Sequence, residues 1–80
     1  LVEKVEGAYD VVAANIVADA IIQLSPAIPR FLKPDGVYIV SGIIDTREAD
    51  VQKALAEARF AVTGRREQGG WICLSCRYAG

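Results

Sequence analysis

The sequence predicts an α/β fold whose first two strands are parallel. Two short apolar runs, residues 11–15 and 37–42, contain β-branched residues, and a helix-like stretch separates them. A strand, a crossover helix and a second strand normally give parallel neighbours. Two further strand-like runs near the end of the chain flank a glycine-bearing turn. We therefore expect the order β-α-β-α-β-β, with two parallel strands and a terminal antiparallel hairpin.

The two parallel strands are expected over residues 9–15 and 36–42. Both are apolar on both faces, a pattern typical of sheets that are covered on two sides. Residues 1–7, ahead of the first strand, resemble the tail of a preceding element. The chain is 52% hydrophobic over only 80 residues, although small domains are rich in surface. The composition therefore fits a slice of a larger sheet better than a self-sufficient domain.

The crossover between these strands contains prolines, which interrupt a continuous helix because they remove a hydrogen bond and clash with the preceding turn. Asp19 can cap the start of this helix. We expect a short helix to about Leu24, then a restart with Ser25 as its cap and Pro26 at the first helical position. Residues 34–36, Pro-Asp-Gly, are then expected to stop the helix and turn the chain.

The second half of the chain predicts one more helix and the hairpin. Asp45 and Glu48 have the spacing of a capping box, which would open a helix that runs through Ala58. The hairpin is expected to have strands over residues 60–67 and 71–78, joined by the turn at 68–70.

Charge and hydropathy exclude several classes of function. With 9 basic and 10 acidic residues, the net charge is −1, so we expect no direct nucleic-acid binding, which needs clustered Lys and Arg. No apolar run approaches the ~18 residues of a membrane span. Residues 3–6 are charged where a signal peptide would be apolar. These features favour a cytoplasmic protein with no membrane contact.

Residue types narrow the possible chemistry further. The chain has no histidine, which excludes a Ser-His-Asp triad and an HExxH zinc site. Four of its aspartates, Asp10, Asp19, Asp35 and Asp45, are expected at a strand start, a helix cap and turns. Cys73 and Cys76 are three residues apart on a predicted strand, so their side chains should point to opposite faces. We therefore expect free thiols and no metal site.

The strongest polar candidates lie where the parallel strands end. Asn15 ends the first strand and Ser41-Gly42 ends the second, and ligands bind parallel sheets at the carboxyl ends of the strands. Two structural alternatives remain open. Asn15 can instead cap the following turn, and Ser41-Gly42 can instead allow close packing of a helix on the sheet.

Three segments carry a resemblance to a known family. Residues 9–19, residues 32–36 and residues 40–43 resemble the class I S-adenosylmethionine-dependent methyltransferases, and more narrowly the bacterial enzymes that methylate ribosomal large-subunit protein eleven. The segment Asn-Ile-Val-Ala-Asp, followed by Ser-Gly-Ile, is the specific part, whereas the Lys-Pro-Asp-Gly turn is common to many class I enzymes. The similarity covers nearly all 80 residues and implies that residues 1–80 are the carboxyl-terminal half of a Rossmann-like methyltransferase domain.

The resemblance implies a function and a site. The cofactor would be S-adenosylmethionine and the substrate a ribosomal protein. Asn15 would orient the amine nucleophile or bind the cofactor, and Ile16, Ser41 and Gly42 would also contact the cofactor. The family's Gly-rich loop, its ribose-binding acidic residue and its substrate-recruiting domain do not occur in these 80 residues. We therefore expect the intact protein to methylate and the fragment alone to be inactive.

Two alternatives and one structural consequence remain. The protein can be a class I methyltransferase that acts on RNA or a small molecule, or a non-catalytic α/β module that only mediates contacts. In the family's strand order, the strand over residues 11–15 neighbours a strand that these residues lack. Because open strand edges recruit other chains, we expect self-association through this edge.

Overall fold

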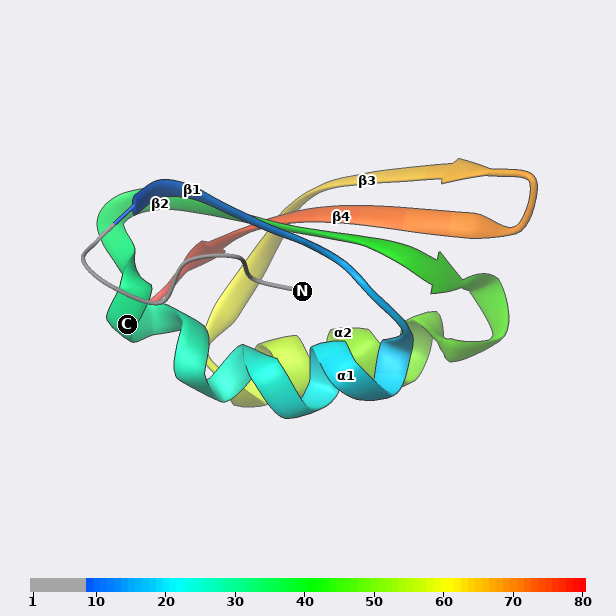
Figure 1. The fold of residues 1–80 in the computed structure, drawn as a ribbon, viewed down its shortest axis with the longest axis horizontal. Coiled ribbons are helices and arrows are strands. Elements are labelled where there is room, and N and C mark those ends of the chain that lie inside the picture. Colours follow the sequence, from blue (N-terminus) through cyan, green and yellow to red (C-terminus); the bar gives the residue numbers. More distant parts are fainter. Residues whose placement is uncertain (1–8) are drawn as a thin grey trace.

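A four-stranded mixed sheet organises the chain (Figure 1). The computed structural model describes residues 9–80, so the expectation for residues 1–7 lies outside the described part. Strand β1 (Tyr9–Asn15) pairs in parallel with β2 (Leu32–Ile44). Strand β4 (Trp71–Tyr78) lies antiparallel between β2 and β3 (Phe60–Gln68), which gives the order β1-β2-β4-β3. The predicted parallel pair and terminal hairpin are confirmed.

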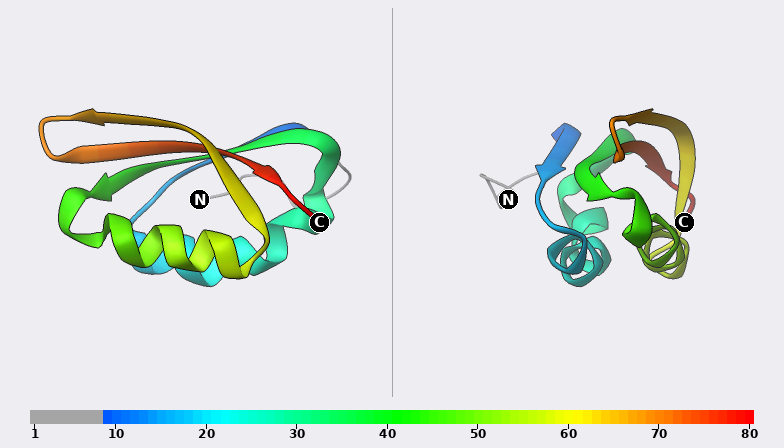
Figure 2. Two further views of the ribbon diagram at one scale, coloured as in Figure 1. Left: turned by 180° about the vertical axis from the view of Figure 1, so that it is seen from behind. Right: turned by 90° about the vertical axis from the view of Figure 1, so that its right-hand side faces the viewer.

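The helices cover one face of this sheet. Helix α1 (Ala18–Leu24) continues into the 3-10 turn η1 (Ser25–Phe31), and α2 (Glu48–Glu57) follows the short 3-10 turn η2 (Asp45–Arg47). Both helices lie side by side beneath the sheet (Figures 1 and 2). No helix of the described residues is long and apolar enough to cross a membrane. The core between the layers consists of Val12, Ala14, Ala18, Ile21, Ile28, Leu32, Tyr38, Val40, Ile43, Val51, Leu55, Phe60, Ile72, Leu74 and Cys76.

The opposite face of the sheet carries no helix within residues 9–80 (Figure 2). Side chains of β1 and β2 that alternate with the core residues are therefore half-buried or exposed, and Val11 is 55% exposed. This uncovered face differs from the two-sided burial that the apolar strands predict. The apolar character of the strands thus exceeds what one layer of helices buries.

Two capping predictions in the crossover are wrong. Helix α1 begins earlier than expected, because the Val17 carbonyl accepts hydrogen bonds from the first turn, and Asp19 lies inside that turn, 2.6 Å from Arg47. Ser25 does not cap a new α-helix either. Its hydroxyl donates to the Ile21 carbonyl at 2.7 Å and lies 3.2 Å from the Tyr38 hydroxyl. The chain continues as a 3-10 turn instead, which tolerates the two prolines.

Residues 33–36 form a large irregular bulge in β2 rather than the expected turn. Tyr9 pairs with Leu32, and Val11 pairs with Val37, so four residues of β2 oppose one residue of β1. A Cβ at Gly36 would lie 2.7 Å from the Leu32 side chain and 3.0 Å from the Asp10 carbonyl oxygen. Only glycine therefore allows the bulge to pack this closely. The Pro-Asp-Gly segment redirects the strand without ending it.

The predicted capping box before α2 is also wrong. The Glu48 carboxylate accepts two hydrogen bonds from Arg65 of β3, at 2.6 and 2.8 Å, and α2 has no side-chain cap. These hydrogen bonds hold the pKa of Glu48 below its usual value. The helix ends at Glu57, one residue before the predicted end. The predicted hairpin is confirmed, but its turn consists of Gly69 and Gly70 alone, because Gln68 belongs to β3. Both glycines have positive φ angles, which two-residue hairpin turns favour.

A buried hydroxyl pair provides a stability test of this packing. Ser25 and Tyr38 are both fully buried, and because the single Ser25 proton is donated to Ile21, Tyr38 donates to Ser25. Replacing Ser25 with alanine leaves the Tyr38 hydroxyl without this acceptor and should lower the free energy of unfolding by about 1–3 kcal/mol in urea titrations. The double variant Ser25→Ala/Tyr38→Phe should cost less than the sum of the single changes. Additive costs would contradict this coupling.

Candidate functional site

The candidate site lies where β1 and β2 end. Asn15 is directly opposite Ser41 in the parallel ladder, and Gly42 follows Ser41. The Asn15 side chain is exposed and alternates with the buried Ala14, so it projects on the face away from the helices. The structure therefore brings together the three predicted residues at the carboxyl edge of the sheet.

Gly42 determines how closely these residues approach. Its φ angle is +79°, a conformation that residues with a side chain rarely adopt, and the register of β2 against β4 shifts at this point. A Cβ at Gly42 would lie 2.6 Å from Asn15 Oδ1, 3.5 Å from the Ile16 carbonyl oxygen and 3.7 Å from the Ile16 amide nitrogen. The close packing at Gly42 is thus against Asn15 and Ile16, not against a helix. Ile16, the fourth predicted residue, joins the same cluster through its backbone.

The Asn15 amide has hydrogen-bonding capacity to spare. In the part of the chain that the structure describes, its side chain takes part in no hydrogen bond, and α1 has no side-chain cap. The alternative in which Asn15 caps the following turn is therefore not observed. An amide offers one acceptor oxygen and two N–H donors. This group can bind an amine, a carboxylate or an amide at the edge of the sheet.

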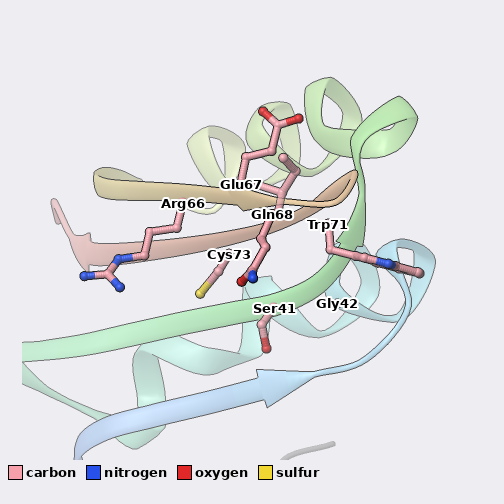
Figure 3. Close-up of a pocket in the computed structure, with 8 residues that line it drawn as sticks. Ser41, Gly42, Arg66, Glu67, Gln68, Trp71 and Cys73 are labelled. Carbon is pink, nitrogen blue, oxygen red and sulfur yellow. The ribbon is translucent and has the colours of Figure 1, made fainter.

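A cavity next to these residues was not predicted from the sequence. It has a volume of about 460 Å³ and lies on the uncovered face between the end of β2 and the β3–β4 hairpin (Figure 3). Its lining consists of Ser41, Gly42, Arg66, Glu67, Gln68, Trp71, Ile72 and Cys73. The position of the hairpin beside β2 depends on long-range pairing, which sequence patterns do not give. The one local signal is Trp71, an aromatic residue directly after the turn.

The two cysteines occupy opposite faces of β4, as strand alternation predicts. Cys73 is half-buried and lines the cavity, whereas Cys76 is fully buried in the core beneath the sheet. Both are free thiols. Burial raises the pKa of Cys76 to about 11, so this thiol stays neutral at physiological pH.

Comparison with known protein families gives a match over almost the whole chain. The family model described as ribosomal protein L11 methyltransferase (PrmA) matches residues 1–79. Among curated proteins, the chain is 46% identical over 76 residues to a ribosomal protein L11 methyltransferase from Desulforamulus reducens and 47% identical over 77 residues to one from Pelotomaculum thermopropionicum. These matches cover 95% and 96% of this chain but 25% of each relative. The chain thus spans about a quarter of the length of these relatives.

Two solved structures share the fold of this chain. A ribosomal protein L11 methylase from Lactobacillus delbrueckii subsp. bulgaricus superimposes with a TM-score of 0.90 at 33% identity, over 95% of this chain and 39% of the other. A fibrillarin pre-rRNA processing protein from Methanococcus jannaschii superimposes with a TM-score of 0.76 at 12% identity, over 92% of this chain and 38% of the other. The second likeness shows the Rossmann-like fold alone.

Proposed function

This chain belongs to the ribosomal protein L11 methyltransferase family, and from that premise we propose that the intact protein is an S-adenosylmethionine-dependent N-methyltransferase of a ribosomal protein. The observation that carries the proposal is the Asn15 amide, which has no hydrogen-bond partner among residues 9–80 and is held against Gly42 at the carboxyl edge of two parallel strands. The 80 residues would form the carboxyl-terminal half of the catalytic domain. The reaction would take place in the cytoplasm, where ribosomal proteins are assembled.

The residues at this edge fit one part of the proposed cofactor. S-adenosylmethionine supplies a methyl group on a positively charged sulfur, which a nucleophile can take. Asn15 and Ser41 offer polar side chains, Ile16 offers backbone groups, and Gly42 adds no bulk. They can surround the reacting end of the cofactor. The uncovered face of the sheet and the quarter-length match support the view that the remaining contacts come from other parts of the protein.

Asn15 has a defined task in this proposal. A Lys amine has a pKa of about 10.4, so it must lose a proton before its lone pair can attack. The amide oxygen of Asn15 would accept one N–H of the neutral amine and thereby aim the lone pair. These 80 residues contain no histidine to take the proton, and water can accept it.

The proposal is tested by the transfer of labelled methyl groups. The full-length protein should label the purified ribosomal protein, and the 80-residue chain alone should neither label it nor bind S-adenosylmethionine at micromolar concentrations in calorimetry. Transfer to RNA or to a small molecule in place of the ribosomal protein would contradict the proposed substrate. Transfer to none of them would favour a non-catalytic module.

We also propose that the isolated chain self-associates through the outer edge of β1. Within residues 9–80, β1 pairs only with β2, and its exposed side chains include Val11 and Ala13. The other edge of the sheet, β3, carries Arg65, Arg66 and Glu67, and charges of this kind protect an edge strand. Light scattering of the 80-residue chain should detect dimers or larger species, which Ala13→Lys should reduce. A strictly monomeric chain at high concentration would contradict the proposal.

A further inference from the structure

The cavity beside the Asn15 site lies in the right place to hold a substrate. It shares Ser41 and Gly42 with that site, so a molecule in the cavity would lie next to the proposed reacting amine. Cys73 is paired with Arg66 across the hairpin, and both lie on the same uncovered face as Asn15. The cavity volume of about 460 Å³ falls within the ~300–1,000 Å³ range typical of ligand sites.

The side chains that line the cavity are suited to a bound molecule that carries hydrogen-bond acceptors and aliphatic groups. Gln68 and Cys73 point toward β2, and Trp71 extends on the other side of Gln68 (Figure 3). The indole of Trp71 is 56% exposed, a large apolar surface without a cover in residues 9–80. Gln68 offers N–H donors as well as an acceptor oxygen. The cavity thus combines polar groups with one aromatic wall.

The charges at the cavity disfavour a cationic occupant. Arg66 forms no ion pair within residues 9–80, whereas the Glu67 carboxylate points to the other side of the hairpin and lies 2.9 Å from Arg65. The free charge at the cavity is therefore positive. It repels a lysine ammonium group and the positively charged sulfur of the cofactor, but it attracts carbonyl oxygens and carboxylates.

We propose that this cavity binds the stretch of polypeptide that flanks the reacting amine of the protein substrate, an inference that rests on the proposed function. Gln68 and Arg66 donate hydrogen bonds to backbone carbonyls or acidic side chains of that stretch, and Trp71 packs on its aliphatic groups. A protein fits better than RNA, because Arg66 is a single cation in a chain with a net charge of −1.

The test compares steady-state kinetics of full-length variants with the purified ribosomal protein as substrate. Trp71→Ala and Gln68→Ala should each raise KM for the ribosomal protein about tenfold, because the loss of one anchoring side chain from an interface commonly weakens the affinity by that factor. Their kcat and their affinity for S-adenosylmethionine should stay within about twofold of the wild type. Trp71→Phe should recover most of the loss. Gln23→Ala, a matched change on the exposed side of α1, should leave KM unchanged.

These results distinguish a failure of this inference from a failure of the proposed function. Transfer to the ribosomal protein with an unchanged KM in both variants would overturn the inference alone. A loss of S-adenosylmethionine affinity in Trp71→Ala would assign the cavity to the cofactor and would also overturn it. Wild-type transfer to RNA instead of protein would overturn the proposed function and this inference together.

Discussion

Replacing Asn15 with alanine in the full-length protein is expected to lower kcat for methyl transfer about 10²-fold, the size of effect that a misplaced reactant produces. The physical reason is the loss of the amide oxygen that would hold one N–H of the amine. Asn15 is exposed and has no hydrogen-bond partner within residues 9–80, so the change should leave the fold and the free energy of unfolding intact. The measurement is kcat at saturating concentrations of both substrates.

The same variant separates the two roles proposed for Asn15. If the amide orients the amine, kcat falls while the dissociation constant of S-adenosylmethionine, measured by calorimetry, changes little. If it binds the cofactor, that constant rises, the rate falls at low cofactor concentration, and kcat at saturating cofactor stays near the wild-type value. Asn15→Asp keeps an acceptor oxygen at the same place and should retain more activity than Asn15→Ala. Wild-type kcat and wild-type cofactor affinity in Asn15→Ala would remove this residue from the site.

The strands were predictable from the sequence because their signals are local. Short β-branched runs and the two glycines of the hairpin turn give the correct elements in the correct order. The caps were not predictable, because distant partners compete for the same side chains. Asp19 is paired with Arg47, 28 residues away, and Glu48 with Arg65, 17 residues away. A capping pattern cannot reveal a partner that only the folded topology brings near.

In the candidate site, too, the features that depend on local sequence signals were predictable and those that depend on long-range pairing were not. The placement of Asn15 opposite Ser41 follows from one rule, that neighbouring parallel strands end at the same edge of a sheet. The positive φ angle of Gly42 and its close approach to Asn15 depend on the register shift between β2 and β4. No local sequence pattern predicts this shift. The cavity beside the hairpin depends on that same antiparallel pairing. The roles of these residues stay predictions until the variants are measured.

Replacing Gly42 with alanine is expected to reduce kcat about as strongly as replacing Asn15 itself. A Cβ at this position would lie 2.6 Å from Asn15 Oδ1, so the amide must move away, and a displacement of about 1 Å at a reacting centre can cost about 10²-fold in rate. The φ angle of +79° adds a conformational cost of about 1–2 kcal/mol for any residue with a side chain. Activity and stability should therefore both fall in this variant.

Two further variants separate the effect on Asn15 from the conformational cost. Gly69 also has a positive φ angle, +58°, but a Cβ there would meet no atom within 4 Å, so Gly69→Ala should lose stability and keep kcat. The double variant Asn15→Ala/Gly42→Ala should have nearly the same kcat as Asn15→Ala, because residues that act as a unit are not additive. A further large drop in the double variant would mean that Gly42 acts independently of Asn15. Because a purely structural defect would multiply the losses, the double variant decides whether Gly42 positions the amide.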